Sequence, residues 1–310
     1  MIKKETFYLK RLIESREFRF DRLELEGIDN SPAISGYGSE IIEQETCLFH
    51  RDVSCGDDYF EGLHTFICEG LSKGNAAPLV RFADGEYAFY ADSLDCNGLY
   101  QQAESVDAIK KIMPIHIEAL NILSQKGKLA PLIYPGNIQD KRKRLFQFFL
   151  AQYRSNDSAL RFAELLFYNK IKLTGINYVP FYIVYAYLTS KRFIETVDGK
   201  KLCIINSKCN IDSCRHWFAR FSSYPNIAFI KIPGSYVATQ WEPIKKDVFN
   251  KMLPESDICL VGAGIGSLLV CVDVAQEFSI PVIDAGHVLN MINNCEDKSG
   301  GARLYTIYKT

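Results

Sequence analysis

Short apolar runs alternate along the chain with longer segments whose apolar residues recur at helical spacing. Six β-prone runs predict strands at residues 78–83, 129–134, 201–205, 227–232, 257–261 and 281–283. Between and before them, helical patterns occupy residues 64–71, 86–92, 105–125, 141–153, 158–168, 181–188, 213–221, 244–253 and 267–277. Strands that alternate with such helices predict a doubly wound, mostly parallel sheet, that is, a Rossmann-like α/β fold.

The pattern of apolar and polar residues changes near residue 76. Before it, residues 5–18 fit an amphipathic helix, and residues 27–38 are rich in Gly, Pro, Ser and Asn, as loops are. We therefore expect a partly helical N-terminal extension over residues 1–75 and an α/β domain over residues 76–310. The extension would either cover part of a site or form a contact in a homo-oligomer.

Composition narrows the class of protein. Hydrophobic residues make up 47% and charged residues 24%, and 36 basic against 37 acidic residues give a net charge of -1. Such a balance is typical of a globular protein and argues against nucleic acid as a partner. The chain shows no secretory signal pattern and no run of 18 apolar residues, so we expect a cytoplasmic protein. Cysteines within apolar runs suit reduced, buried thiols, and the loose spacing of Cys209, Cys214 and His216 lacks a fourth zinc ligand.

The fold predicts where a ligand binds. In open α/β sheets, ligands bind beyond the carboxyl ends of the strands. In this chain, glycine and polar residues gather after those ends, at residues 84–86, 206–208, 233–240, 262–266 and 284–287. Asn206 and Lys208, which follow the third strand, are therefore candidate substrate-binding residues.

The segment Arg81-Phe82-Ala83-Asp84-Gly85-Glu86 carries two carboxylates at a strand-to-helix junction. Because Gly85 permits a sharp turn, Asp84 and Glu86 can converge on one divalent cation that also binds phosphate oxygens. Arg81 is placed to pair with a phosphate. The alternative is structural: Asp84 as a helix N-cap and Glu86 as an acid in the first helical turn.

Two further motifs lie near the C-terminus. The turn at Gly262, Gly264 and Gly266 follows an apolar strand and precedes an apolar helix, where backbone N–H groups can meet phosphate. The alternative is structural: the glycines allow close packing of the helix on the strand with no ligand. A strict dinucleotide fingerprint needs glycine at position 267, which is serine, and further strands after Asp284, where only residues 285–310 remain. Asp284 and His287 end the last strand and suit ligand contact or proton transfer.

Taken together, an Arg-Phe-x-Asp-Gly-Glu motif and a distant Ile-Asp-x-Gly-His strand end resemble the GT-D-type glycosyltransferases, a family long catalogued as a domain of unknown function. The resemblance runs from about residue 77 to about residue 291. It implies a nucleotide-sugar donor, a UDP-sugar by family habit, and Mn²⁺ or Mg²⁺ held by Asp84 and Glu86. It also implies a glycan, lipid-linked or protein-linked acceptor, as in polysaccharide biosynthesis.

The chain departs from the family pattern at both ends. Ala83 replaces the family's usual glycine, and Val261-Gly262-Ala263-Gly264 stands where many members have Leu-Gly-Pro-Thr. After His287, where many members continue with acidic residues, this chain reads Val288-Leu289-Asn290-Met291. Its substrate is therefore expected to differ.

Two weaker signals complete the set. The basic run 141–144 precedes an aromatic run at 145–150, which suits either contact with the inner face of an anionic membrane or a solvated helix start with a buried far face. Glu242, beside Trp241, is the candidate general base if the transfer inverts the sugar. Trp241 itself suits either stacking on a ligand or the core.

Two other classes of function remain open. One is an NAD(P)- or flavin-dependent oxidoreductase that uses the turn from Gly262 to Gly266 and is indifferent to loss of Asp84. The other is a non-catalytic GT-D-like protein that binds a nucleotide or a partner and turns over no sugar donor.

Overall fold

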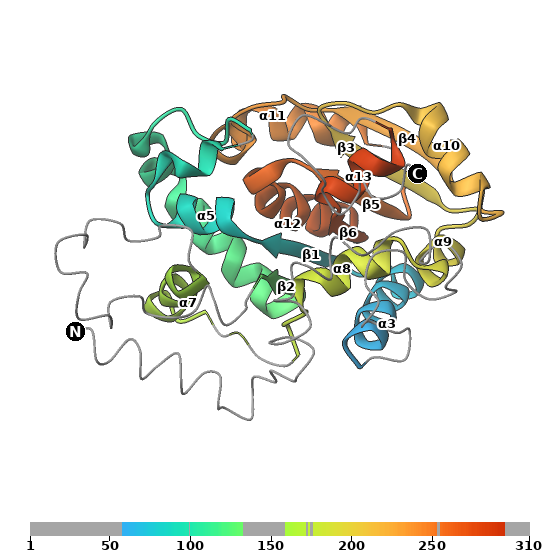
Figure 1. Ribbon diagram of the computed structural model, residues 1–310, viewed down its shortest axis with the longest axis horizontal. Coiled ribbons are helices and arrows are strands. Elements are labelled where there is room, and N and C mark those ends of the chain that lie inside the picture. Colours follow the sequence, from blue (N-terminus) through green and yellow to red (C-terminus); the bar gives the residue numbers. More distant parts are fainter. Residues whose placement is uncertain are drawn as a thin grey trace, which may run out of the picture.

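The computed structural model describes residues 58–98, 100–132, 159–171, 173, 176–252 and 255–294 (Figure 1). The helix expected at residues 5–18, the loop at 27–38 and the basic and aromatic runs at 141–150 lie outside these residues. Within them, each of the six expected strands is present. The mostly parallel α/β fold class is confirmed.

Six strands form one sheet in the order β2-β1-β6-β5-β3-β4, and every neighbouring pair is parallel. Their bounds are β1 Ala77–Phe82, β2 Lys128–Pro131, β3 Lys201–Asn206, β4 Asn226–Lys231, β5 Ile258–Gly262 and β6 Pro281–Asp284. The two motif-bearing strands β1 and β6 are neighbours, although about 200 residues separate them along the chain. This pairing brings both ends of the predicted site to one place.

Both faces of the sheet are buried, as parallel sheets require. Side chains of a strand alternate between two core clusters: in β3, Cys203 and Ile205 face one cluster and Leu202 and Ile204 the other. The same alternation holds for β1, β5 and β6, and it explains why these strands read as continuous apolar runs.

Helices cover both faces of the sheet. One face carries α5 (Val106–Lys126) and α12 (Ser267–Phe278), with α4 (Asp84–Tyr90), α7 (Ala159–Tyr168) and α11 (Val237–Lys251) in the same core cluster. The other carries α3 (Asp58–Lys73), α8 (Phe181–Leu188), α9 (Lys191–Thr196), α10 (Ile211–Ala219) and α13 (Gly286–Ile292). In Figure 1, α3, α8 and α9 gather at the lower right, away from α11 at the top.

Helix α3 lies before the domain boundary that the sequence places at residue 75. Its apolar face nevertheless contributes Phe60, Leu63 and Ile67 to the core cluster that lines the sheet, and all three are fully buried. In the structure, α3 is therefore continuous with the α/β domain.

Some helices differ from expectation for local reasons. Helix α11 begins at Val237 rather than residue 244. It is kinked at Gln240, three residues ahead of Pro243, so a short helical segment precedes the part that the sequence predicts. Helix α13 begins at Gly286, where the sequence predicts only the end of a strand. Helix α9 is not predicted by the sequence. Both helices are only seven and six residues long, too short for a periodic signal.

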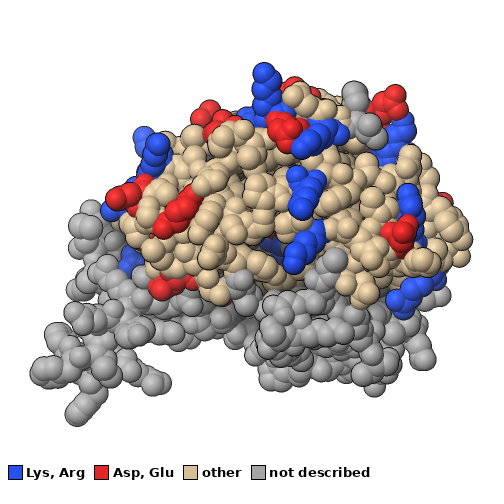
Figure 2. All heavy atoms as spheres, turned by 90° about the horizontal axis from the view of Figure 1, so that it is seen from above, with Lys and Arg blue, Asp and Glu red and all other residues tan. Residues whose placement is uncertain are grey.

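Charges of both signs occur on one face of the molecule. Seen from above, Lys and Arg residues are interspersed with Asp and Glu over the described part of the molecule (Figure 2). Among the described helices, none is both long enough and apolar enough to cross a membrane.

Candidate active site

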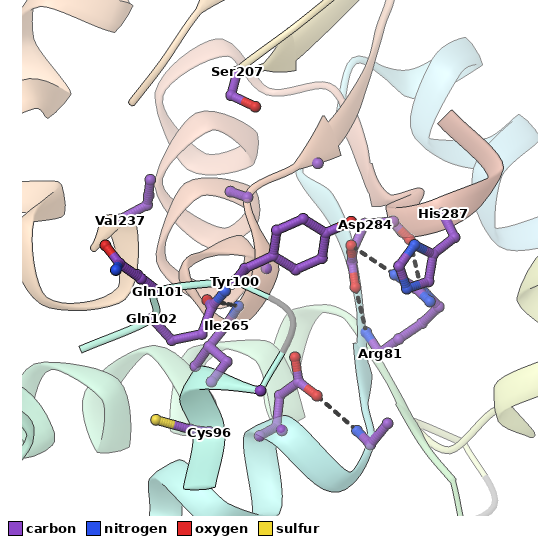
Figure 3. Close-up of a pocket in the computed structure, with 18 of the residues that line it drawn as sticks. Arg81, Cys96, Tyr100, Gln101, Gln102, Ser207, Val237, Ile265, Asp284 and His287 are labelled. Carbon is purple, nitrogen blue, oxygen red and sulfur yellow. Dashed lines mark hydrogen bonds and ion pairs between the residues drawn. The ribbon is translucent and has the colours of Figure 1, made fainter. Parts of the chain in front are cut away.

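A pocket of about 470 Å³ lies beyond the carboxyl ends of the strands, where the fold predicts a ligand. Its size is in the range of small-molecule sites. Residues that follow β1, β3, β4, β5 and β6 line it: Asp84, Gly85, Glu86, Ser207, Pro233, Gly234, Ala263, Gly264, Gly286 and His287. The loop between α4 and α5 supplies further lining residues, including Tyr100, Gln101 and Gln102 (Figure 3).

A buried ion pair joins the two sequence motifs across β1 and β6. The Arg81 Nη2 atom lies 3.0 Å from Asp284 Oδ1, and both side chains are less than 10% exposed. Arg81 Nε donates to the Asp284 carbonyl at 2.9 Å, and the Arg81 backbone N–H donates to Asp284 Oδ2 at 3.2 Å. Three contacts therefore fix the end of β1 against the end of β6.

Helix α8 completes the surroundings of Arg81. The guanidinium lies 4.6 Å from the centre of the Tyr185 ring and 5.2 Å from that of Phe181, and it donates a hydrogen bond to the Tyr185 hydroxyl. Burial raises the pKa of Tyr185 to about 12, with Arg81 acting in the opposite direction. Although burial lowers the pKa of Arg81, the charge of Asp284 raises it above its ordinary value, so this arginine stays charged.

Gly286 is required by this ion pair. Its φ is +46°, and a Cβ placed on it would lie 1.9 Å from Arg81 Nη2. No other residue type permits both this backbone conformation and this close approach. The glycine of the Asp-Ala-Gly-His motif thus makes room for Arg81. The sequence assigned Arg81 to a phosphate and Asp284 to the ligand, but the structure pairs them with each other at the pocket wall.

Burial in the pocket disfavours the charged form of Glu86. Its Oε2 accepts a hydrogen bond of 2.9 Å from the Ala83 backbone N–H, which caps the start of α4. Burial raises the pKa of Glu86 to about 7, the Asp284 charge adds to this, and the Ala83 N–H and Arg81 oppose it. Glu86 is therefore a pocket carboxylate that gains from a nearby cation.

Asp84 and Gly85 form the rest of this wall. Ala83, not Asp84, is the N-cap of α4, so the structural role expected for Asp84 falls to Glu86. Asp84 is exposed and lines the pocket beside Glu86. Gly85 has no positive φ, so the sharp turn expected of it is absent. A Cβ there would meet nothing within 4 Å, which leaves this stretch of backbone open to a ligand.

The pocket is acidic. Its lining contains four carboxylates (Asp84, Glu86, Asp95 and Asp284) and one arginine, which is already paired with Asp284. Carboxylate oxygens are the donors that Mg²⁺ and Mn²⁺ prefer, and such ions often take only one or two protein carboxylates and complete their shell with phosphate and water. Asp84 and Glu86 fit this pattern. The described residues contain no group of three or more His, Cys, Asp or Glu side chains able to hold a metal.

The glycine turn after β5 packs against protein. Gly264 has a φ of +56°, and a Cβ there would lie 2.5 Å from the Gln102 side chain; one on Gly266 would lie 2.6 Å from Val237. The Ile265 N–H donates to Gln102 Oε1 at 2.9 Å. The N–H groups of residues 263 and 266 also donate within the turn, to the Ser267 hydroxyl and the Ala263 carbonyl. These three donors are therefore not available to a phosphate.

The sequence does not predict that the loop between α4 and α5 lines the pocket. The Asn97 side chain accepts the backbone N–H groups of Gln102 and Ala103, at 2.7 and 3.0 Å, and donates to the Ala103 carbonyl. The Tyr236 N–H donates to the Gln101 carbonyl at 2.8 Å. The loop is thus held against the glycine turn and the start of α11. A run of Asn, Gly and Gln without periodicity gives no sequence signal for such a contact.

Four proposed or alternative site residues lie elsewhere. Glu242 is exposed on α11 and does not line the pocket, because Trp241 beside it is the residue that turns inward. Trp241 is fully buried and donates to Asp273 Oδ2 at 2.7 Å, so it belongs to the core. Lys208 is exposed, and Gly266 is buried behind the turn. By contrast, Asn206, Gly262 and His287 line the pocket.

The cysteine cluster does not assemble a metal site either. Cys209 Sγ and Cys214 Sγ are 3.8 Å apart, on either side of the start of α10. His216 is exposed, and its Nδ1 contacts the Asp212 carbonyl of its own helix at 2.7 Å.

No protein-family model matches the chain, and neither does any curated protein. Two solved structures are similar to it. One, described as "The highly conserved domain of unknown function 1792 has a distinct glycosyltransferase fold", is 18% identical, covers 75% of this chain and 83% of that chain, and has a TM-score of 0.42. A selenomethionine-substituted structure of that domain is 17% identical over the same shares, with a TM-score of 0.40. The chemistry of the site therefore rests on this chain's own residues.

Replacing Arg81 by methionine should lower the free energy of unfolding by about 3–5 kcal/mol, because Asp284 would remain buried without its partner. Chemical denaturation measures this. The matched control is Arg215→Met, whose pair with Asp212 is exposed and should contribute less than about 1 kcal/mol. Equal costs for the two variants would contradict the role given to the ion pair.

Replacing Glu86 by glutamine should change how stability depends on pH. The native pKa of about 7 exceeds the ordinary 4.5, so the folded protein binds more protons between these values and wild type loses stability as pH rises through this window. The stability of Glu86→Gln relative to wild type should therefore increase from pH 4.5 to pH 7, as measured by denaturation.

Two features make this difference interpretable. Burial lowers the pKa of His116 to about 4, so this residue acts in the opposite sense, but equally in both proteins. Glu118→Gln, which makes the same change on the exposed surface of α5, is the matched control. A difference between Glu86→Gln and wild type that stays constant with pH would show that the pKa of Glu86 is ordinary.

Proposed function

We propose that this chain is a metal-dependent glycosyltransferase that moves a sugar from a nucleotide-sugar, a UDP-sugar, to a glycan, lipid-linked or protein-linked acceptor. The observation that carries the proposal is the meeting of the two motifs that resemble GT-D enzymes. Asp84 and Glu86 follow β1, Asp284 ends β6, His287 follows it, and all four line one pocket.

The charge of the pocket supports an anionic ligand that arrives with a cation. A bare diphosphate would meet Asp84, Glu86 and Asp95, with the nearest arginine already neutralised by Asp284. Asp84 and Glu86 would hold Mn²⁺ or Mg²⁺, which, when bound, neutralises negative charge on a diphosphate leaving group. The backbone of Gly85 would let the diphosphate approach this wall, since no side chain fills the space.

Other residues of the pocket position these groups. Arg81 and Asp284 hold the ends of β1 and β6 together, so that the carboxylates of α4 and the imidazole of α13 face the same space. They are positioning residues. Asn206 also lines the pocket, and its Oδ1 accepts the Ser207 N–H at 2.8 Å.

The oxidoreductase alternative loses its main support. It needs the turn from Gly262 to Gly266 to present N–H groups to a pyrophosphate, whereas Gln102 and Ser267 occupy two of them. The non-catalytic alternative shares the proposed pocket and differs only in turnover. It is therefore separated from the glycosyltransferase by a product assay, not by binding.

The test is the melting temperature with UDP, UDP-sugars, GDP-sugars and NAD(P)H, each with and without Mn²⁺. A ligand at 100 times its Kd contributes about 2.7 kcal/mol, enough for a clear shift. We expect a Mn²⁺-dependent shift with one nucleotide-sugar, lost in Asp84→Asn and in Glu86→Gln, followed by release of the nucleotide when an acceptor is supplied.

Asp107→Asn and Glu118→Gln are matched controls, because they make the same changes at exposed acids of α5 outside the pocket. Both should keep the wild-type shift. A metal-independent shift with NAD(P)H, or none with any nucleotide, would overturn the proposal. Binding without turnover of any sugar donor would favour the non-catalytic alternative.

A further inference from the structure

Tyr100 is the aromatic side chain at the mouth of the pocket that the proposed function leaves without a role. It is 41% exposed, lines the pocket, and has no hydrogen bond to its hydroxyl among the described residues. Its ring extends from the α4–α5 loop toward Asp284 and His287 (Figure 3). A large exposed aromatic ring beside a pocket is a contact surface for a ligand.

The loop holds Tyr100 in place. The carbonyl of Gln101 accepts the Tyr236 N–H, and the Gln102 side chain is bonded to the Ile265 N–H. Glu104, further along, accepts hydrogen bonds from the Thr239 hydroxyl and the Gln240 amide. These ties on the C-terminal side of Tyr100 reduce the entropy that a ligand would lose by ordering it.

His287 forms the facing wall. The ring centres of Tyr100 and His287 are 6.3 Å apart, and their planes are inclined by 34°. The two side chains thus place aromatic surface side by side at this end of the pocket. A planar group can stack on an exposed aromatic face at about 3.5 Å over its whole area, whereas a puckered sugar ring makes fewer such contacts. This surface therefore suits a planar aromatic group.

Asn290 provides the polar edge. It lies one turn after His287 on α13, three residues on, and so on the same face of that helix. It lines the pocket, and its amide has no hydrogen-bond partner among the described residues. An amide offers both a donor and an acceptor, the combination that reads the edge of a base.

We propose that Tyr100, His287 and Asn290 form the subsite for the base of the nucleotide, with Tyr100 stacked on the face of the base and Asn290 bonded to its edge. This inference rests on the proposed function. It adds which residues recognise the nucleotide and which of them set its identity. Stacking accepts every base, since each has a π-face, so Tyr100 gives affinity and Asn290 gives selectivity.

The experiment is titration calorimetry in saturating Mg²⁺, with UDP, CDP, GDP, ADP and pyrophosphate as probes. Tyr100→Ala should weaken all four nucleotides by about 5- to 150-fold, the range for one stacked base, and leave pyrophosphate unchanged. Tyr100→Phe should bind like wild type, because the ring and not the hydroxyl makes the contact. Asn290→Ala should weaken the preferred nucleotide most and narrow the differences among the four.

Tyr224→Ala, at a tyrosine that is 69% exposed, and Asn250→Ala, on the exposed side of α11, are the matched controls and should change nothing. Wild-type affinity for nucleotides in Tyr100→Ala, or equal weakening of pyrophosphate, would overturn the base subsite. It would leave the donor site standing. If wild type binds neither nucleotide nor pyrophosphate, the proposed function itself fails, and the base subsite with it.

Discussion

The ion pair between Arg81 and Asp284 is the interaction on which the architecture of the site depends. An arginine on a central strand is costly to bury unless a carboxylate and further acceptors surround it. Here Asp284 supplies its side chain and its backbone carbonyl, and Tyr185 supplies a hydroxyl. The pair stands in the layer between β1, β6 and α8, so it ties together three segments that lie far apart in the sequence.

From this pair the rest of the pocket follows. The guanidinium leaves no room for a side chain at residue 286, so glycine is needed there, and α13 begins at this glycine, with His287 next to it in the pocket lining. On the other strand, α4 starts at Asp84, three residues after Arg81, and presents Asp84 and Glu86. Because Asp284 pairs with Arg81, and no lysine or second arginine lines the described pocket, the charges of these two carboxylates are not balanced there, and the site favours a ligand that brings a cation.

Much of the fold and of the candidate site can be predicted from the sequence. The alternation of apolar runs and helical patterns is strong in parallel α/β proteins, and it predicted all six strands and the position of the pocket at their carboxyl ends. The motif residues Asp84, Glu86, Asp284 and His287 were expected near one another, and they all line that pocket. These predictions succeeded because they depend on periodicity and topology.

The sequence could not predict which buried groups bond to one another. Arg81 appeared as a phosphate ligand, because nothing local reveals that Asp284 is bonded to it from 203 residues away. The glycine turn looked like a phosphate loop, because the Gln102 side chain that fills it comes from a loop without any pattern. Glu242 is not in the pocket, because the helical phase of α11 turns Trp241 inward and Glu242 outward, and the sequence alone does not reveal that phase across the kink at Gln240.

The most direct test is the anomalous X-ray signal of Mn²⁺ in crystals grown with UDP. We expect one peak in coordination contact with the carboxylates of Asp84 and Glu86 and with the diphosphate, and none in crystals of Glu86→Gln. A peak elsewhere, or UDP bound in the pocket with no metal beside these two residues, would contradict the account.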